Sequence, residues 1–252
     1  MGRSKKSIGK KLGVLFCGAL MVAAGIMGEK LTERAERGRV AVETAAPAVI
    51  ERPVIVLDAG HGGIDGGCVS ADGVPEKGIN LNIMLSTRDM LEMLGYDVRC
   101  TREKDISIHD EGIKGTGAQK RSDMDNRLEI INGSNARLAL SIHQNRFTDP
   151  KYSGAQMFYK EGDAESSRFA DTLRERFRAI LQPENERETK PVGEELFLIH
   201  NAKCPAVMAE CGFLSNPEEA SKLCSEKYQR EIAFTLTDSI NRYLAGELTE
   251  SD

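Results

Sequence analysis

Three short apolar segments of this sequence are each followed within four residues by a side chain that can bind a metal ion. The three pairs are residues 54–57 with His61, residues 138–142 with His143, and residues 206–209 with Glu210. Short runs rich in Val, Ile, Leu and Ala, bounded by Gly, Pro or polar residues, are typical of buried strands. The carboxyl ends of parallel strands meet at one edge of an open α/β sheet, and ligands bind there. We therefore expect these three side chains to lie close together.

Helical segments alternate with strand-like segments along the chain. Apolar residues recur at helical spacing in residues 79–94, 123–132, 164–181 and 228–244, and further strand-like segments are residues 96–100, 156–159 and 196–199. Such alternation predicts an α/β fold, a single domain with a twisted, mainly parallel sheet flanked by helices on both faces. We place this domain at residues 53–246 and a tail at residues 247–252. The polar residues 105–122 are predicted to form a mobile surface loop.

The N-terminal residues predict a targeting element. Five basic residues within residues 1–11 precede an uncharged stretch, residues 12–28. This stretch is near the lower limit of about 17 residues for a membrane span, and it also suits the core of a signal peptide. Basic residues before an apolar segment keep that end in the cytoplasm and direct the rest outside. We interpret residues 1–11 as a cytoplasmic segment, residues 12–28 as a transmembrane anchor or else a signal-peptide core, and residues 29–52 as a linker. The domain would then act outside the cytoplasm, anchored or secreted.

The charge distribution argues against nucleic acid as a partner. The first 40 residues hold nine Lys and Arg against three Asp and Glu, which leaves 25 basic against 36 acidic residues in the other 212. Proteins that bind phosphate backbones normally present a basic face. The chain also has no Trp and only 5% aromatic residues, which does not favour stacking on single strands. The six cysteines contain no CxxC pair, so no zinc knuckle or disulfide framework is predicted.

Two His and two Glu are available for a catalytic metal site. Two imidazoles and one carboxylate, with a fourth position left for water, are common protein ligands of catalytic zinc. A further carboxylate can take a proton from the attacking water. His61 and His143 supply the imidazoles, whereas Glu76 and Glu210 supply the carboxylates. The spacing does not decide which Glu binds the metal, and Glu76 also suits a helix N-terminus, where the helix dipole stabilises a carboxylate.

Residues near these candidates are assigned supporting roles. We interpret Asp58 and Asp65 as turn residues or as hydrogen-bond partners of the metal ligands. Arg127 is interpreted as a helix-surface or structural ion-pair residue. Gly212 would let the backbone approach a substrate beside Glu210. His109 is treated as a hydrogen-bonded or surface residue, which is the common role of a lone His.

Four segments of the sequence resemble a known family, the zinc-dependent N-acetylmuramoyl-L-alanine amidases often called amidase 3. The segments are Val56-Leu57-Asp58-Ala59-Gly60-His61-Gly62-Gly63, Glu76-Lys77-Gly78-Ile79-Asn80-Leu81, Ser141-Ile142-His143-Gln144-Asn145 and Ala209-Glu210-Cys211-Gly212-Phe213-Leu214-Ser215-Asn216. They follow the family's order over residues 53–244. The resemblance implies that His61, Glu76 and His143 bind Zn²⁺ and that Glu210 is the catalytic general base. It also implies a phosphorylase/hydrolase-like sheet.

The same resemblance implies hydrolysis of the amide between the lactyl group of N-acetylmuramic acid and L-alanine in peptidoglycan. The short chain, the single N-terminal apolar segment and Ser153-Gly154-Ala155-Gln156 before a strand look most like the sporulation or germination-specific branch. Members of that branch help to form the muramic lactam of spore cortex, which would place this protein in the cell envelope or forespore. An accessory envelope protein is a further expected partner. Gln144 and His200 depart from the family pattern, and we interpret both as residues that could touch substrate.

Two other functions remain open from the sequence. A zinc carboxypeptidase or endopeptidase acting within the stem peptide would use the same metal chemistry, because its specificity depends on the shape of the groove. A non-catalytic wall-binding protein could retain the fold, but it would have no chemical need for Glu210.

Overall fold

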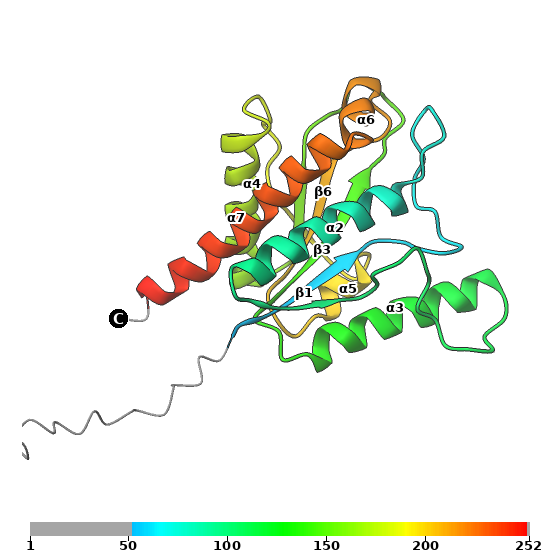
Figure 1. Ribbon diagram of the computed structural model, residues 1–252, viewed down its shortest axis with the longest axis horizontal. Coiled ribbons are helices and arrows are strands. Elements are labelled where there is room, and N and C mark those ends of the chain that lie inside the picture. Colours follow the sequence, from blue (N-terminus) through cyan, green and yellow to red (C-terminus); the bar gives the residue numbers. More distant parts are fainter. Residues whose placement is uncertain (1–51, 251–252) are drawn as a thin grey trace, which may run out of the picture. The chain divides into compact units, whose positions relative to one another are not determined.

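A six-stranded, mainly parallel sheet forms the centre of the computed structural model, which describes residues 52–250 with side chains placed to residue 246 (Figure 1). The strands are β1 (Val54–Ala59), β2 (Asp97–Cys100), β3 (Leu138–Asn145), β4 (Gln156–Lys160), β5 (Lys190–Val192) and β6 (Ala206–Phe213). They lie in the order β2-β1-β3-β6-β4-β5. Strands β2, β1, β3 and β6 are parallel, and β4 is antiparallel to β6. The predicted α/β class and mainly parallel sheet are confirmed.

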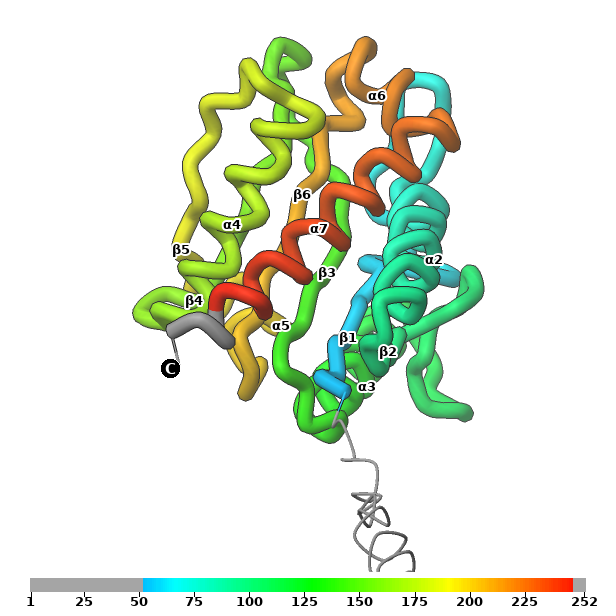
Figure 2. The backbone as a smooth tube through the Cα atoms, turned by 60° about the vertical axis from the view of Figure 1, so that its left-hand side comes forward, coloured from blue at the N-terminus to red at the C-terminus, as the bar shows by residue number. Residues whose placement is uncertain are grey.

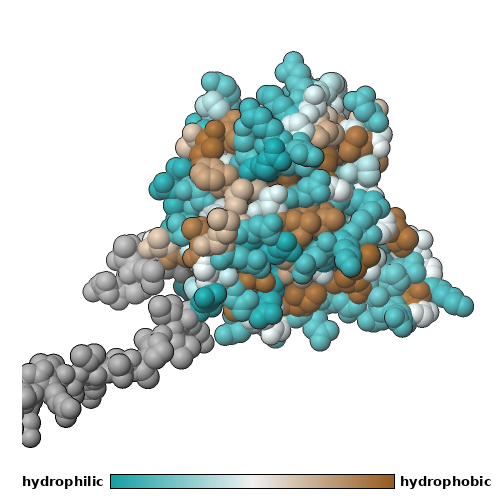
Figure 3. Space-filling view, viewed as in Figure 1, coloured by the Kyte–Doolittle hydropathy of each residue, from teal (hydrophilic) through white to brown (hydrophobic). Residues whose placement is uncertain are grey.

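Helices cover both faces of this sheet, as predicted. They are α2 (Glu76–Met93), α3 (Thr116–Gly133), α4 (Ala164–Ile180), α5 (Phe197–Asn201), α6 (Pro217–Leu223) and α7 (Glu226–Glu250). Helices α2, α4 and α7 pack on one face, which we call the α7 face, and α7 lies between the other two (Figure 2). Helices α3 and α5 pack on the opposite face, the α3 face. The surface seen in Figure 3 is mostly hydrophilic, with apolar side chains in separate patches.

Alternate residues of the central strands pack on opposite faces of the sheet. Ile55 and Leu57 belong to the larger apolar cluster beneath α2, α4 and α7, whereas Val56 belongs to the smaller cluster beneath α3 and α5. The same alternation in β3 and β6 directs His143 and Glu210 toward the α3 face. The two-residue period of the strands thus determines which side of the sheet can carry the chemistry.

Two local predictions were wrong. Residues 197–199 lie in helix α5, with Leu196 as its N-cap, and do not form a strand. Four apolar residues are too few to show a period, so the sequence did not distinguish the two. Helix α3 begins at Thr116 and takes in the end of the segment predicted to be a loop. The rest of that segment is irregular but is bonded to α3, since Asp123 Oδ1 accepts from the Ile108 N–H at 2.7 Å and from the Ser107 hydroxyl at 2.8 Å. Strand β5 and helix α6 were not predicted.

The predicted targeting element lies outside the described residues. The basic segment 1–11, the apolar segment 12–28 and nearly all of the linker 29–52 precede the described part of the chain. Within residues 52–250, no helix combines the length and the apolar character needed to cross a membrane. The interpretation of residues 12–28 as an anchor or signal-peptide core therefore stays a prediction.

Candidate metal and catalytic site

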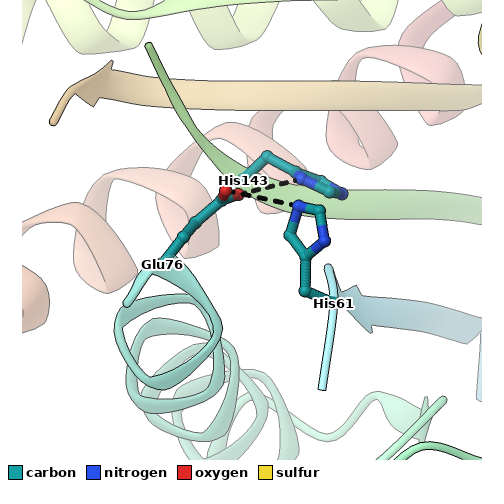
Figure 4. A group of neighbouring side chains, drawn as sticks. All are labelled: His61, Glu76 and His143. Atoms are coloured by element: carbon teal, nitrogen blue, oxygen red, sulfur yellow. Dashed lines mark hydrogen bonds and ion pairs between the residues drawn. The ribbon is translucent and has the colours of Figure 1, made fainter. Parts of the chain in front are cut away.

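His61, Glu76 and His143 converge at the carboxyl edge of the sheet (Figure 4). His61 lies in the loop after β1, His143 lies in β3, and Glu76 is the first residue of α2. One potential ligand atom from each residue lies within 4.8 Å of the others. His61 Nε2 is 3.2 Å from Glu76 Oε2, and His143 Nδ1 is 3.0 Å from Glu76 Oε1. The fold thus brings together three residues that are far apart in the sequence.

The chemistry and spacing of these donors suit a zinc ion. Ligand atoms about 2.0–2.1 Å from a tetrahedral zinc lie roughly 3.3 Å from one another. The separations of 3.2 Å and 3.0 Å between imidazole nitrogens and carboxylate oxygens are close to that value. Two imidazoles and one carboxylate also leave a fourth position for water or substrate. The residues therefore fit the metal that the sequence resemblance implies.

Asp65 orients the His61 ring and adds negative charge beside it. Asp65 Oδ2 lies 3.0 Å from His61 Nδ1, and Lys120 Nζ lies 2.9 Å from Asp65 Oδ1. This contact leaves His61 Nε2 facing Glu76, and it supports the interpretation of Asp65 as a partner of a ligand. Burial lowers the pKa of His61, but the carboxylates of Glu76 and Asp65 raise it more, to about 9. The site stabilises positive charge, which protons or a metal ion can supply.

Two glycines let the backbone approach the three side chains closely. A Cβ on Gly60 would lie 2.2 Å from His143 Nε2, and a Cβ on Gly67 would lie 2.5 Å from Glu76 Oε2. His61 itself has a φ of 63°, which is uncommon for a residue other than glycine. Arg127 Nη2 donates to its carbonyl oxygen at 2.7 Å and so supports this conformation.

Arg127 and Asp58 form a buried ion pair beneath the site. Arg127 Nη1 is 2.6 Å from Asp58 Oδ1, and Arg127 Nε is 2.6 Å from Asp123 Oδ2. Burial raises the pKa of Asp58, but Arg127 and the hydroxyls of Ser141 and Thr101 lower it more, to about 2. Arg127 is 1% exposed, so the structural ion-pair interpretation is confirmed and the helix-surface interpretation is wrong.

Glu210 lies beside the cluster with one carboxyl oxygen unpaired. The register of β3 and β6 pairs it with His143. Its Oε2 is buried and has no hydrogen-bond partner within the described part of the chain. Burial raises the pKa of Glu210 to about 7, where His143 opposes the shift and the Glu76 carboxylate adds to it. A buried, unpaired carboxyl group with a pKa near neutrality is suited to proton transfer.

A cavity of about 250 Å³ adjoins the cluster on the α3 face. His61 and His143 border this cavity. Its other lining includes the apolar side chains of Ile64, Met124, Phe197 and Met208 and the charged side chains of Lys120 and Glu195. Substrates commonly bind in mainly apolar cavities that contain a few polar groups. The cluster therefore has adjacent space for part of a substrate.

The other two candidate histidines are not part of the metal-capable group. His109 Nδ1 lies 2.9 Å from the Ser107 hydroxyl, and its Nε2 lies 3.2 Å from Gln119 Nε2. This agrees with the interpretation of His109 as a hydrogen-bonded residue. His200 lies in α5, and its buried Nδ1 has no hydrogen-bond partner among residues 52–250.

Gln144 and Gly212 do not have the roles that the sequence suggested. Gln144 is 3% exposed and donates to Asn80 Oδ1 on the α7 face, so it does not face the cavity beside His143. A Cβ on Gly212 would lie 2.8 Å from the Glu219 carboxyl carbon. This glycine makes room for a buried carboxylate and not for a substrate.

Arg102 supports the loop that carries His61, and it was not predicted from the sequence. Its buried guanidinium donates to the carbonyl oxygens of Ala59, Gly60 and Lys77 at 2.9, 3.0 and 2.8 Å. Arg102 follows the end of β2, at the same edge of the sheet as the other site residues. The rule that ligands bind beyond the carboxyl ends of the strands, applied to the predicted strand 96–100, would have identified it.

Comparison with known proteins identifies a family and close relatives. Residues 55–242 match the Amidase_3 family, described as N-acetylmuramoyl-L-alanine amidase. The germination-specific N-acetylmuramoyl-L-alanine amidase of Bacillus subtilis (strain 168) is 38% identical over 190 residues, which cover 75% of this chain and 79% of that protein. AmiA of Escherichia coli (strain K12) is 26% identical over 234 residues and 75% of each chain. The CwlD amidase from Clostridioides difficile, solved in complex with the GerS lipoprotein, is 40% identical with a TM-score of 0.75, over 77% of this chain and 99% of that one.

Proposed function

Because this chain belongs to the Amidase_3 family of N-acetylmuramoyl-L-alanine amidases, we propose that it acts with a zinc ion held by His61, Glu76 and His143 and with Glu210 as general base. The family's reaction is hydrolysis of the amide between the lactyl group of N-acetylmuramic acid and L-alanine in peptidoglycan. One observation carries the proposed roles. Three metal-capable side chains converge beside a buried carboxyl group whose Oε2 has no partner within the described residues.

The side chains divide the work of amide hydrolysis among them. Zinc bound at this site would lower the pKa of a water molecule and polarise the substrate carbonyl. Glu210 Oε2 takes a proton from the attacking water, for which a pKa near 7 is suitable. Glu210 then gives this proton to the L-alanine nitrogen as the C–N bond breaks, which yields a lactyl carboxyl group and a free amine. Asp65 keeps His61 oriented throughout.

We further propose that the enzyme acts outside the cytoplasm, in the envelope of the spore. The germination-specific relative and the similarity to CwlD support this role, in which removal of the stem peptide would precede formation of muramic lactam in the cortex. The relative solved with a lipoprotein also supports an accessory envelope protein as partner. Residues 12–28 would serve as the membrane anchor or signal-peptide core that exports the domain.

Digestion of purified peptidoglycan tests the proposal. The full-length protein is treated with a chelator and then resupplied with zinc, and the products are separated by mass spectrometry. We expect new N-terminal L-alanine on intact stem peptides, which disappears on chelation and returns with zinc. Shortened stems with the lactyl amide intact would instead indicate a carboxypeptidase or endopeptidase, and binding to the wall without products would indicate a non-catalytic protein.

A further inference from the structure

The Asn80 side chain contacts all three segments that carry the proposed metal ligands. Asn80 lies one turn after Glu76 in α2 and is 0% exposed. Its Nδ2 donates to Glu76 Oε1 at 3.0 Å and to the carbonyl oxygen of Gly60, the residue before His61, at 3.2 Å. Its Oδ1 accepts from Nε2 of Gln144, the residue after His143, at 3.2 Å. One buried amide thus joins the surroundings of all three ligands.

The orientation of this amide is determined by its partners. Both hydrogens of Asn80 Nδ2 are used, and a reversed amide would place Oδ1 against two acceptors, Glu76 Oε1 and the Gly60 carbonyl. Gln144 holds the observed orientation by donating to Oδ1. The backbone N–H groups of Gln144 and Cys68 also donate to the two oxygens of Glu76, each at 2.9 Å. The Glu76 carboxylate is therefore held by three donors besides the imidazoles.

Strand geometry places the two residues of β3 on opposite sides of the sheet. His143 points to the α3 face and reaches the cluster, whereas Gln144 points to the α7 face and reaches Asn80. Gln144 Oε1 is buried and has no hydrogen-bond partner within the described residues. Such an oxygen costs stability, and an apolar side chain of similar size would avoid this cost. A buried amide at this position is thus better explained by the site than by packing.

We propose that Asn80, held in orientation by Gln144, is a positioning residue that sets the affinity of the metal site. It fixes the Glu76 carboxylate and the Gly60 backbone in place before an ion binds, so that less ordering is needed on binding. Residues that orient metal ligands through hydrogen bonds commonly change metal affinity by about 10- to 100-fold. The inference rests on the proposed metal site and adds residues that touch neither substrate nor ion.

Zinc affinity of single variants provides the test. The zinc dissociation constants of full-length, metal-free protein are measured by competition with a chromophoric chelator. Asn80→Asp keeps the shape of the side chain but turns a carboxylate oxygen toward Glu76 Oε1, and we expect zinc binding to weaken about 10- to 100-fold. Gln144→Met removes the donor that orients Asn80, and we expect zinc binding to weaken about tenfold. With saturating zinc, KM should be unchanged for both variants.

A double variant tests whether Gln144 acts through Asn80. In the Asn80→Ala background Gln144 has no Asn80 side chain to donate to, so adding Gln144→Met should weaken zinc binding no further. Losses that simply add would show that Gln144 acts by another route, which would overturn the proposed arrangement. Should Asn80→Asp fail to fold, Gln144→Met still decides the question.

Two controls separate this role from a structural one and from the proposed function. Asn82→Asp makes the same substitution on the exposed side of α2, where Asn82 Nδ2 bonds to Gln229 Oε1 at 3.2 Å, and it should leave zinc affinity unchanged. The urea midpoint of metal-free Gln144→Met should stay near that of wild type, since one unpaired buried oxygen replaces another. Equal zinc affinity in wild type and all variants would overturn this inference alone, whereas a wild type without tight zinc binding would overturn the proposed function.

Discussion

The α7 face and the α3 face of the sheet are both buried, but they are built from different kinds of side chain. The largest fully buried side chains beneath the α7 face include Phe169 and Phe177, which belong to the larger apolar cluster. The largest one on the α3 face is Arg127, which is held by Asp58 and Asp123 beside a cavity. Away from the strand ends, the α7 face is thus built from a large buried apolar cluster, whereas the α3 face is charged and borders a cavity near the strand ends.

This difference indicates how the fold separates stability from chemistry. The α3 face carries features that cost free energy, such as the unpaired oxygen of Glu210 and the positive φ of His61. Natural folds accept such costs at functional sites when packing elsewhere compensates for them. We therefore expect substitutions near the strand ends, on the α3 face and at Asn80 and Gln144, to affect activity first. Substitutions in the larger apolar cluster beneath the α7 face should affect stability first.

The largest effect is expected for Glu210→Gln. Loss of the general base should lower kcat by roughly 10²- to 10⁴-fold, because the amide cannot accept the proton of the attacking water. Zinc content should remain that of wild type, since Glu210 is not a proposed ligand. The free energy of unfolding should not fall, because a neutral amide replaces a buried carboxyl group. Turnover of purified muropeptides and metal analysis of the same samples provide the measurement.

Glu219→Gln is the matched control for that prediction. Glu219 is also buried, and burial raises its pKa, but its carboxylate accepts the backbone N–H groups of Gly154 at 3.0 Å and Phe213 at 2.7 Å. The substitution should lower stability and leave kcat within a few-fold of wild type. If Glu219→Gln lost as much activity as Glu210→Gln, or if Glu210→Gln remained within tenfold of wild type, the assignment of Glu210 as general base would fail.

The parts of the site that follow from local rules were predictable from the sequence. His61, His143 and Glu210 each follow a buried apolar run, and the parallel strands that these runs form end at one edge. Glu76 begins a helix, where a carboxylate has an ordinary structural use, so only the resemblance to a family separated the two interpretations. Within one strand, the alternation of side chains placed His143 and Glu210 on the same face.

The parts that depend on packing between distant elements were not predictable. Arg127 pairs with Asp58 across the boundary between α3 and the sheet, and no spacing in the sequence encodes that contact. Gln144 was interpreted as a residue that could touch substrate because it follows His143, but the strand directs it to Asn80 on the other face. Helix α5 was predicted to be a strand because its short apolar run has no measurable period.

A substitution beneath the α7 face should have the second largest effect, and on stability alone. Phe177 is fully buried in α4, and Phe177→Ala should lower the free energy of unfolding by about 3–5 kcal/mol through lost burial and the cavity left behind. Turnover per folded molecule, measured well below the unfolding transition, should not change. Phe234, which is 55% exposed on α7, is the control, and Phe234→Ala should change stability by less than about 0.5 kcal/mol. A large loss of turnover in folded Phe177→Ala would show that packing beneath the α7 face also determines activity, which would contradict the prediction.

The smallest of these effects is a loss of stability in acid. We expect the free energy of unfolding to fall at low pH because Asp58, on the α3 face, becomes protonated. Burial raises the pKa of this carboxyl group, but Arg127 and two hydroxyls lower it more, to about 2, against 3.8 as the ordinary value. Because the folded-state pKa is the lower one, this stabilisation is present above about pH 4 and is lost as the pH falls toward 2. The difference between the two pKa values corresponds to about 2 kcal/mol.

Urea unfolding of wild type and Asp58→Asn at several pH values measures this contribution. Asp58→Asn should be the less stable protein at pH 6, because Arg127 loses a buried partner. The difference in free energy of unfolding between wild type and Asp58→Asn should fall by about 2 kcal/mol as the pH approaches 2, because the wild-type carboxylate is then protonated. Asp149→Asn is the control, because Asp149 is an exposed carboxylate beside Lys151 and its pairing is screened by solvent. If the difference in free energy of unfolding between wild type and Asp58→Asn stayed constant with pH, Arg127 would not hold this carboxylate in its charged form. The α3 face would then be no more sensitive to acid than the α7 face.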